Sequence, residues 1–193
     1  MKSITVFCGS SYDSNPAYRR HAKDLGTYMA QHQISLVYGG AKVGLMGIIA
    51  DTVLSHNGSV IGVIPHFLQT KEIAHQNLTE LIMVDSMHQR KHKMSKLCDG
   101  FIAMPGGFGT LEELFEVLTW AQLGLHSKPI GLLNIDGYYE DLTNMIDKMV
   151  NQKFLNPLNR DMLIIDDNVE YLITSMMAYK APDIPKWLKK DQV

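Results

Sequence analysis

Hydrophobic residues along the chain follow two patterns: short unbroken runs, and longer segments in which they recur every three or four positions. Runs of about four to eight residues predict buried strands, and the wider spacing predicts helices. The predicted strands cover residues 4–8, 34–38, 59–64, 81–84, 100–104, 129–134 and 162–165. The predicted helices cover residues 16–33, about 47–56, 87–97, 110–123, 137–153 and 168–179, with a loop over the functional site at 66–79.

Strands and helices alternate throughout this pattern. Because the strands are continuous apolar runs, they are expected to be buried on both faces, which is typical of a parallel sheet. We therefore expect an α/β fold of three layers, with a mostly parallel sheet between two layers of helices. The length of 193 residues fits one such domain. We expect this domain to occupy residues 1–180 and a tail to occupy residues 181–193.

Composition narrows the function classes. A net charge of −2 gives no support to nucleic-acid binding, which usually shows a basic surplus. No apolar run reaches the length of a membrane span, and the first residues run directly into a strand rather than forming a signal peptide. The two cysteines, Cys8 and Cys98, make neither a disulfide framework nor a metal set. We expect a cytoplasmic protein that binds neither nucleic acid nor a membrane.

The most informative stretch is Met-Pro-Gly-Gly-Phe-Gly-Thr-Leu-Glu-Glu at residues 104–113. It lies between a predicted strand and a predicted helix, and its glycines let the backbone approach a ligand closely. The helix, predicted to begin near Thr110, offers free N–H groups and the positive end of its dipole to an anion. Phosphate is the expected occupant, with the carboxylates of Glu112, Glu113 and Glu116 close by.

Two more glycine-bearing turns, at residues 9–11 and 39–47, also follow predicted strands. In a parallel sheet such turns meet at one edge, where ligands bind. Ser10, Gly39 and Gly40 are therefore expected to line the same crevice as the central turn, which is the glycine-rich turn at residues 105–110. A dinucleotide fingerprint is not complete, because Glu112 stands where its third glycine belongs. A P-loop is disfavoured in the same way, because Leu45 stands where that motif requires lysine.

The predicted helix at residues 87–97 contains two histidines, His88 and His92, at the spacing of metal ligands. Cationic neighbours disfavour a metal, so we interpret both as solvated. Arg90 lies on the apolar stripe with Met87 and Met94, and a charge on a buried face requires a partner. A structural carboxylate could serve, but a ligand anion or a site carboxylate is the favoured interpretation.

Residues 86–91 (Ser-Met-His-Gln-Arg-Lys) and 105–113 together resemble the paired signature of the Lonely Guy (LOG) family. Its members are nucleoside-5'-monophosphate phosphoribohydrolases that activate cytokinins, and many were formerly labelled possible lysine decarboxylases. The resemblance continues through residues 7–11, 38–46, 118–124 and 128–139, and it extends to about residue 179.

The resemblance implies a Rossmann-like fold, a homodimer and hydrolysis of the base–ribose bond of AMP or cytokinin riboside 5'-monophosphate, with no cofactor. By matching position, Arg90 and Glu113 would be the catalytic pair. The substrate-binding residues it implies are Glu72, Lys91, Gly107, Phe108, Gly109, Thr110, Leu111, Glu112 and Thr119, and Gly106 joins them as the start of the phosphate cradle.

The chemistry of the residues agrees with this implication. Glycosidic cleavage passes through a transition state in which the sugar is cationic and oxocarbenium-like. A carboxylate close to the sugar either stabilises this charge or activates the attacking water. Glu113, placed in the first helical turn, is expected to be ionised because the helix dipole favours the charged form. Arg90 either holds Glu113 or assists the departing base. Thr119 points about 120° away from Glu113 on an ideal helix, so it is expected to serve the partner's site in the homodimer.

Two other functions compete. A pyridoxal-phosphate lysine decarboxylase needs a Schiff-base lysine, and no spacing marks Lys42, Lys91 or Lys128 for that role. The chain is also short for such an enzyme. The second alternative is a nucleotide-binding module without catalysis, and the pairing of Arg90 with Glu113 argues against it.

Overall fold

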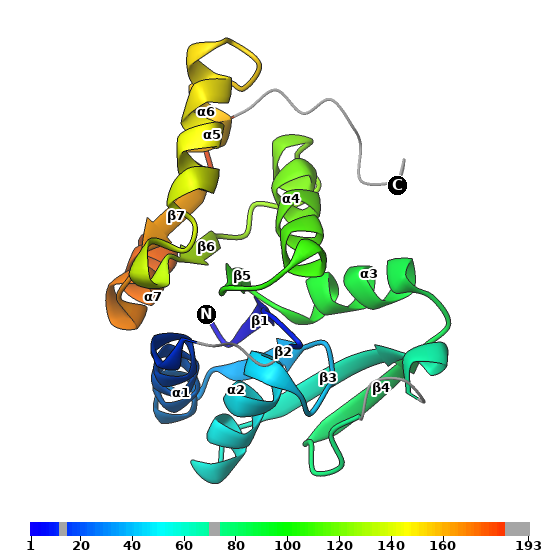
Figure 1. Ribbon diagram of the computed structural model, residues 1–193. Coiled ribbons are helices and arrows are strands. Elements are labelled where there is room, and N and C mark those ends of the chain that lie inside the picture. The colour runs from blue at the N-terminus through cyan, green and yellow to red at the C-terminus, as the bar shows by residue number, and fades with distance from the viewer. Residues whose placement is uncertain (12–14, 70–73, 184–193) are drawn as a thin grey trace.

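The computed structural model describes residues 1–11, 15–69 and 74–183 of the chain. A 7-stranded parallel sheet with the strand order β4-β3-β2-β1-β5-β6-β7 runs through the centre (Figure 1). The strands are β1 (Ser3–Phe7), β2 (Ser35–Tyr38), β3 (Val60–Pro65), β4 (Glu80–Val84), β5 (Gly100–Ala103), β6 (Ile130–Leu133) and β7 (Leu163–Asp166). The predicted α/β fold with a parallel sheet is confirmed.

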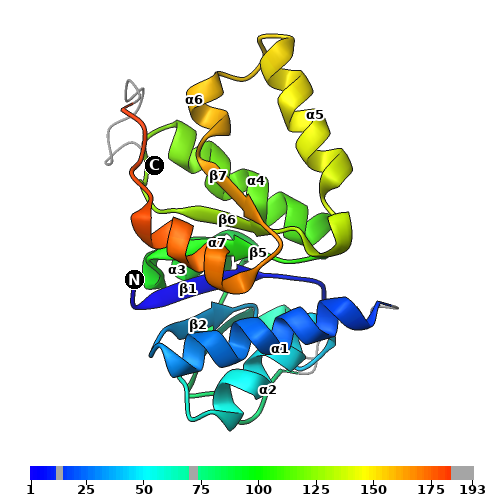
Figure 2. The ribbon, with the colours of Figure 1, turned by 90° about the vertical axis from the view of Figure 1, so that its left-hand side faces the viewer.

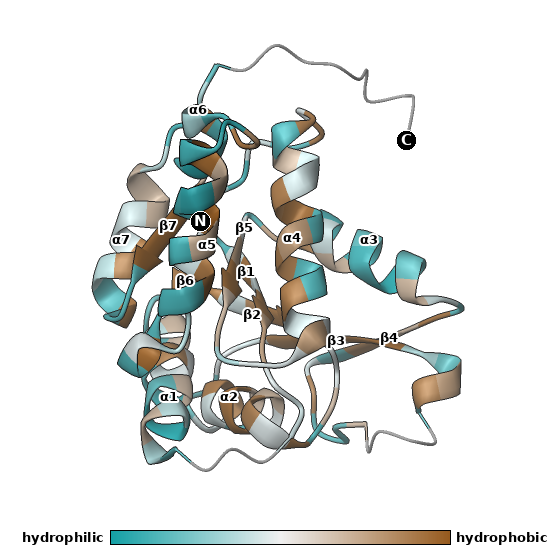
Figure 3. Cartoon of the chain, turned by 45° about the horizontal axis from the view of Figure 1, so that its top comes forward, coloured by the Kyte–Doolittle hydropathy of each residue, from teal (hydrophilic) through white to brown (hydrophobic). Residues whose placement is uncertain are grey.

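Helices cover both faces of the sheet (Figures 1 and 2). The helices α1 (Pro16–Gln31), α2 (Gly44–Ser55) and α7 (Val169–Ala178) pack on one face, and α3 (Met87–Leu97), α4 (Phe108–Gln122) and α5 (Glu140–Asn151) pack on the other. Consecutive strand residues point to opposite faces: in β5, Phe101 joins the core under α3 and α4, and Ile102 joins the core under α1 and α7. Figure 3 shows the hydrophobic residues concentrated in the strands between these layers.

Side-chain caps explain where several helices begin. Asn15 accepts a hydrogen bond from the Ala17 N–H at the start of α1, and Ser86 accepts one from the Gln89 N–H at the start of α3. At the start of α4 the cap position is Gly107, which has no side chain to satisfy the first N–H groups. The first turn of α4 is therefore open to a ligand.

The helix α3 forms the crossover from the edge strand β4 back to the central strand β5. Hydrogen bonds connect α3 to two strands, β3 and β1. The Arg90 Nε donates to the Val63 carbonyl of β3, and the Thr5 hydroxyl of β1 donates to the Met94 carbonyl. This path brings Arg90 from one edge of the sheet toward its centre.

The element boundaries differ from the predicted ones in a few places. The helix α4 begins at Phe108, two residues before Thr110, and β3 includes Pro65 as its last residue. The predicted loop at 66–79 contains a short 3-10 helix, η1 (His66–Leu68). Two further short helices, η2 (Ile135–Gly137) and α6 (Pro157–Arg160), were not predicted. No helix within the described part of the chain is both long and apolar enough to cross a membrane.

Candidate active site

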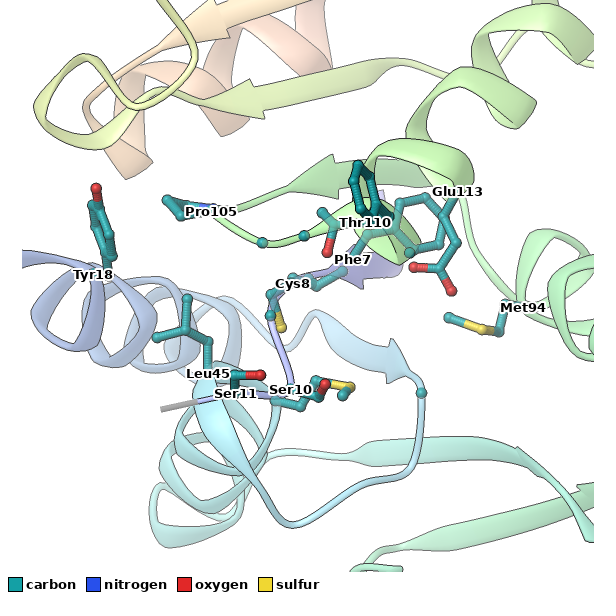
Figure 4. A pocket seen from close by; sticks show the side chains of 18 of the residues that line it. Phe7, Cys8, Ser10, Ser11, Tyr18, Leu45, Met94, Pro105, Thr110 and Glu113 are labelled. Carbon is teal, nitrogen blue, oxygen red and sulfur yellow. The ribbon is translucent and has the colours of Figure 1, made fainter. Parts of the chain in front are cut away.

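The strand order reverses between β1 and β5, and a cavity of about 570 Å³ opens beyond the ends of these two strands. This is where parallel α/β sheets bind ligands, and the volume is that of a small-molecule site. Figure 4 shows Tyr18 at one end of the cavity and Glu113 with Met94 at the other, with the turn after Pro105 between them.

The three predicted glycine-bearing turns meet around this cavity. The Gly9 N–H donates to the Pro105 carbonyl at 3.0 Å, and the Leu45 N–H donates to the Gly9 carbonyl at 3.0 Å. Gly44 has a φ of +59°, and a Cβ atom there would lie 2.6 Å from the carbonyl carbon of Ser10. Close contact between the turns therefore requires glycine at position 44.

The central turn forms a cradle for an anion. A Cβ at Gly106 would lie 2.1 Å from the Thr110 Oγ1, so this glycine is packed tightly against the first turn of α4. At Gly107 and Gly109, by contrast, a Cβ would have no neighbour within 4 Å, because both positions face open space. The uncapped N–H groups of the helix start are therefore accessible from the cavity. The Phe108 side chain between these glycines is 93% exposed at the rim.

Arg90 and Glu113 form a buried pair at the far end of the cavity. The Arg90 Nη1 lies 3.6 Å from the Glu113 Oε1, and both side chains are about nine-tenths buried. A Cβ at Gly39 would lie 2.0 Å from the Arg90 Nη2. Gly39, in the turn at residues 39–47, thus leaves room for the guanidinium group of Arg90. The sequence predicted that a buried Arg90 would need a charged partner, and in the structure that partner is the carboxylate of Glu113.

Glu113 does not have the electrostatic setting expected from the sequence. Burial raises its pKa to about 7, and the opposing attraction of Arg90 is too weak to restore the usual value. Because α4 begins at Phe108, Glu113 is the sixth residue of the helix and lies beyond its first turn, where the dipole has little effect. The prediction of a readily ionised carboxylate was therefore wrong. A carboxyl group with a pKa near 7 can give and take a proton at neutral pH.

Lys91 does not line the cavity but binds two carboxylates of α4. Its Nζ donates to the Glu112 Oε1, and to the Glu116 Oε1 at 2.9 Å. Burial lowers the pKa of Lys91, but the hydrogen bonds to these carboxylates outweigh it and the pKa rises. The triad clamps α3 to α4 one residue away from the Arg90–Glu113 pair.

The structure brings together most, but not all, of the predicted site residues. Those that line the cavity are Ser10, Gly39, Arg90, Gly106, Gly107, Phe108, Gly109, Thr110 and Glu113. Those that lie outside it are Gly40, Lys91, Leu111, Glu112 and Thr119. Thr119 instead lines a separate groove of about 230 Å³ along α4 and α5. Glu72 falls outside the described residues.

Several cavity residues were not singled out from the sequence. An apolar set lines the wall around Arg90 and the second turn: Leu45, Met46, Leu68, Met87 and Met94. Two tyrosines, Tyr18 and Tyr138, complete the opposite end with their rings packed edge to face at 5.6 Å. Tyr138 follows β6, so the rule that turns after parallel strands share one edge could have found it.

The lysines and histidines that the sequence suggested as cofactor or metal ligands do not line the cavity. No lysine is among the described residues that line the cavity. Lys128 donates to the Ser95 carbonyl and lies 5.8 Å from the centre of the Phe101 ring, and Lys42 is exposed. The residues His88 and His92 are exposed on α3. Within the described ranges, no group of three or more His, Cys, Asp or Glu residues could hold a metal ion.

Comparison with known proteins gives consistent matches along the chain. A family model described as "Possible lysine decarboxylase" matches residues 46–176. The chain is 47% identical over 179 residues to cytokinin riboside 5'-monophosphate phosphoribohydrolase LOG7 of Arabidopsis thaliana, covering 93% of this chain and 82% of that protein. It is 46% identical over 178 residues to the probable phosphoribohydrolase LOGL6 of Oryza sativa subsp. japonica, covering 92% of this chain and 71% of that protein.

A solved structure of lower sequence identity shares the fold. The molybdenum cofactor binding protein from Rippkaea orientalis has a TM-score of 0.67 and 22% identity, with 92% of this chain and 97% of that chain covered. This likeness concerns the fold alone.

Proposed function

The chain belongs to the family of the cytokinin riboside 5'-monophosphate phosphoribohydrolases, and from this premise we propose that it hydrolyses the N-glycosidic bond of nucleoside 5'-monophosphates. The substrates are AMP or a cytokinin riboside 5'-monophosphate, and the products are the free base and ribose 5-phosphate. The observation that carries the proposal is the buried Arg90–Glu113 pair, which shares one cavity with an open helix start suited to phosphate.

The cavity suggests how the substrate lies. The 5'-phosphate binds at the turn from Gly106 to Thr110, where N–H groups and the helix dipole favour an anion. Binding energy from this remote phosphate helps to place the ribose against Glu113. The base then occupies the wall near Met87 and Met94, which is apolar and accommodates a ring system.

The reaction breaks the bond between the sugar C1' and the base nitrogen, and the bonding electrons leave with the base. Positive charge develops on the sugar, and the Glu113 carboxylate stabilises it and takes a proton from the attacking water. The water oxygen becomes the new substituent of C1', and the proton that Glu113 takes from the water is passed on to the departing base, which restores the Glu113 carboxylate. Arg90 holds the Glu113 carboxylate in place at 3.6 Å and favours its ionised form.

An assay of the purified protein on AMP, isopentenyl-AMP and adenosine tests this function. We expect release of free base and ribose 5-phosphate from the two monophosphates and much weaker release from adenosine, because adenosine lacks the anchoring phosphate. Equal specific activity on AMP and adenosine would contradict the phosphate cradle. Tight AMP binding without base release would indicate a nucleotide-binding module instead.

Substitution of the catalytic pair separates binding from chemistry. Glu113→Gln is expected to lower turnover by roughly 10²–10⁴, while calorimetry shows AMP binding close to that of the wild type. Arg90→Ala is also expected to lower turnover, and the double variant should lose less than the product of the two single effects because the residues act as a unit. Near-normal turnover of Glu113→Gln would remove Glu113 from the mechanism.

We further propose that the active form is a homodimer. The groove that contains Thr119 is lined by the apolar side chains of Phe115, Leu118, Ile146 and Met149, and Phe115 is 36% exposed. A second copy packed here would cover these side chains and bring Thr119 toward a neighbouring chain. Light scattering at assay concentrations should give twice the monomer mass, and a fully active monomer would contradict the proposal.

The proposed compartment is the cytoplasm, and the cysteines fit it. Cys8 and Cys98 are both free and buried. Burial raises the pKa of each thiol, so both are held in the unreactive protonated form.

A further inference from the structure

Tyr138 lies at the Tyr18 end of the cavity, and no step of the proposed reaction uses it. It comes from the segment between β6 and α5, so it reaches the cavity from a different part of the fold than the central turn. Its hydroxyl donates a hydrogen bond to the Gly106 carbonyl at 2.6 Å. This distance is at the short end of the range for O–H···O bonds, so the contact is a close one.

The Gly106 carbonyl belongs to the same rigid peptide plane as the Gly107 N–H, and the two groups point in opposite directions. The plane lies between two glycines, so no Cβ atom on either side opposes its rotation. With the Gly107 N–H taken as a donor to the bound phosphate, rotation by half a turn would present a carbonyl oxygen in its place. The hydrogen bond from Tyr138 selects one of these two orientations.

Tyr138 is itself held firmly. Asp136 has a φ of +51° and Gly137 a φ of +71°, so two consecutive left-handed residues set the direction in which the chain presents Tyr138. The Asp136 carboxylate accepts a hydrogen bond from the Asn15 side chain at 3.0 Å. The Tyr18 ring packs edge to face against Tyr138 at 5.6 Å. The hydroxyl therefore reaches Gly106 from a preorganised position.

We propose that Tyr138 is a positioning residue that fixes the Gly106–Gly107 peptide plane and so prepares the cradle for a phosphate monoester. The inference rests on the proposed function only in taking the bound group to be the 5'-phosphate of a nucleotide. Tyr138 acts through the backbone of the turn, and it contributes to substrate affinity rather than to bond breaking.

Tyr139→Phe provides a matched control. Its hydroxyl also donates to a backbone carbonyl just before the turn, that of Met104, at 2.7 Å. Its ring, however, is 2% exposed and does not line the cavity. The two Tyr→Phe changes thus remove the same kind of hydrogen bond from the same region, but only Tyr138→Phe frees the peptide plane of the cradle.

Calorimetric titration with ribose 5-phosphate tests the proposal, because this probe carries the phosphate but no base and cannot be turned over. Tyr138→Phe should weaken its binding by about tenfold, and Tyr139→Phe should change it by no more than about twofold. With AMP as substrate, Tyr138→Phe should raise KM by a similar factor and leave kcat nearly unchanged. Circular dichroism checks that both variants are folded.

Each other outcome decides against the proposal. Unchanged affinity of Tyr138→Phe for ribose 5-phosphate, an equal loss in both variants, or a fall in kcat without a change in KM would overturn it. Absence of ribose 5-phosphate binding by the wild type would overturn it as well. Failure of the wild type to release base from AMP would instead reject the proposed function, and the titration would still decide the role of Tyr138.

Discussion

Glu113→Gln preserves the shape of a side chain that is about nine-tenths buried and removes its charge. The pKa of Glu113 is raised in the folded protein to about 7 from its usual 4.5. Between these two values the folded state keeps a proton that the unfolded state has lost. The free energy of unfolding therefore falls as the pH rises through this window, and it stays reduced above it.

The size of this loss follows from the difference between the two pKa values. The interval from 4.5 to about 7 corresponds to about 3 kcal/mol at 25 °C. Glutamine resembles the protonated carboxyl group at every pH, so the variant does not suffer the loss. At pH 8 we expect Glu113→Gln to be more stable than the wild type by up to about 3 kcal/mol, or roughly 6–12 °C in Tm for a chain of this length. At pH 4.5 the two proteins should be nearly equal.

Urea unfolding followed by circular dichroism at pH 4.5 and pH 8 measures this effect, and a turnover assay at pH 8 measures the opposite effect on activity. Glu80→Gln, a change at an exposed carboxylate on β4, serves as the control and should show no pH-dependent gain. A Glu113→Gln variant that is less stable than the wild type at pH 8 would refute the reasoning. That result would mean that the attraction between Arg90 and Glu113 outweighs the burial of the carboxylate.

Three further predictions follow from the same geometry. If the ionised Glu113 is the active form, kcat/KM for AMP should rise with pH through an apparent pKa near 7, and a flat profile between pH 6 and 8 (about one unit on either side of it) would contradict this role. Gly39→Ala should lower turnover by about a hundredfold with the fold intact by circular dichroism, because the new Cβ would lie 2.0 Å from the Arg90 Nη2; normal turnover would show that the guanidinium can move aside. Lys91→Met should lower the free energy of urea unfolding by about 1–3 kcal/mol, because it leaves the mostly buried Glu116 carboxylate without its cation, and an unchanged midpoint would show that this ion pair contributes nothing.

The layered fold could be predicted from the sequence because the strands are unbroken apolar runs. The sequence also predicted that the three glycine-bearing turns meet, because turns that follow parallel strands lie at the same edge of the sheet. The start of α4 was placed too late because Gly107 and Gly109 have low helix propensity, whereas the structure begins the helix at Phe108.

The raised pKa of Glu113 could not be predicted from the pattern. Burial of this carboxylate depends on α3 packing across the sheet and bringing Arg90 against α4, which is a tertiary contact. Tyr138 was missed for a related reason. Its role depends on one hydrogen bond to Gly106, 32 residues earlier in the chain, and no sequence pattern predicts that contact.

The route of α3 has a consequence for how the active site appears during folding. Arg90 is tied to β3, in the half of the sheet made by the first four strands, and Glu113 belongs to the helix that follows β5. Among the described strands, the two halves of the sheet pair only where β1 lies beside β5, which joins residues such as Ile4 and Gly100 that are far apart in the chain. Contacts of such long range form slowly. In a refolding experiment, helical signal should therefore return before base-releasing activity, and neither half of the chain expressed alone should form the Arg90–Glu113 pair.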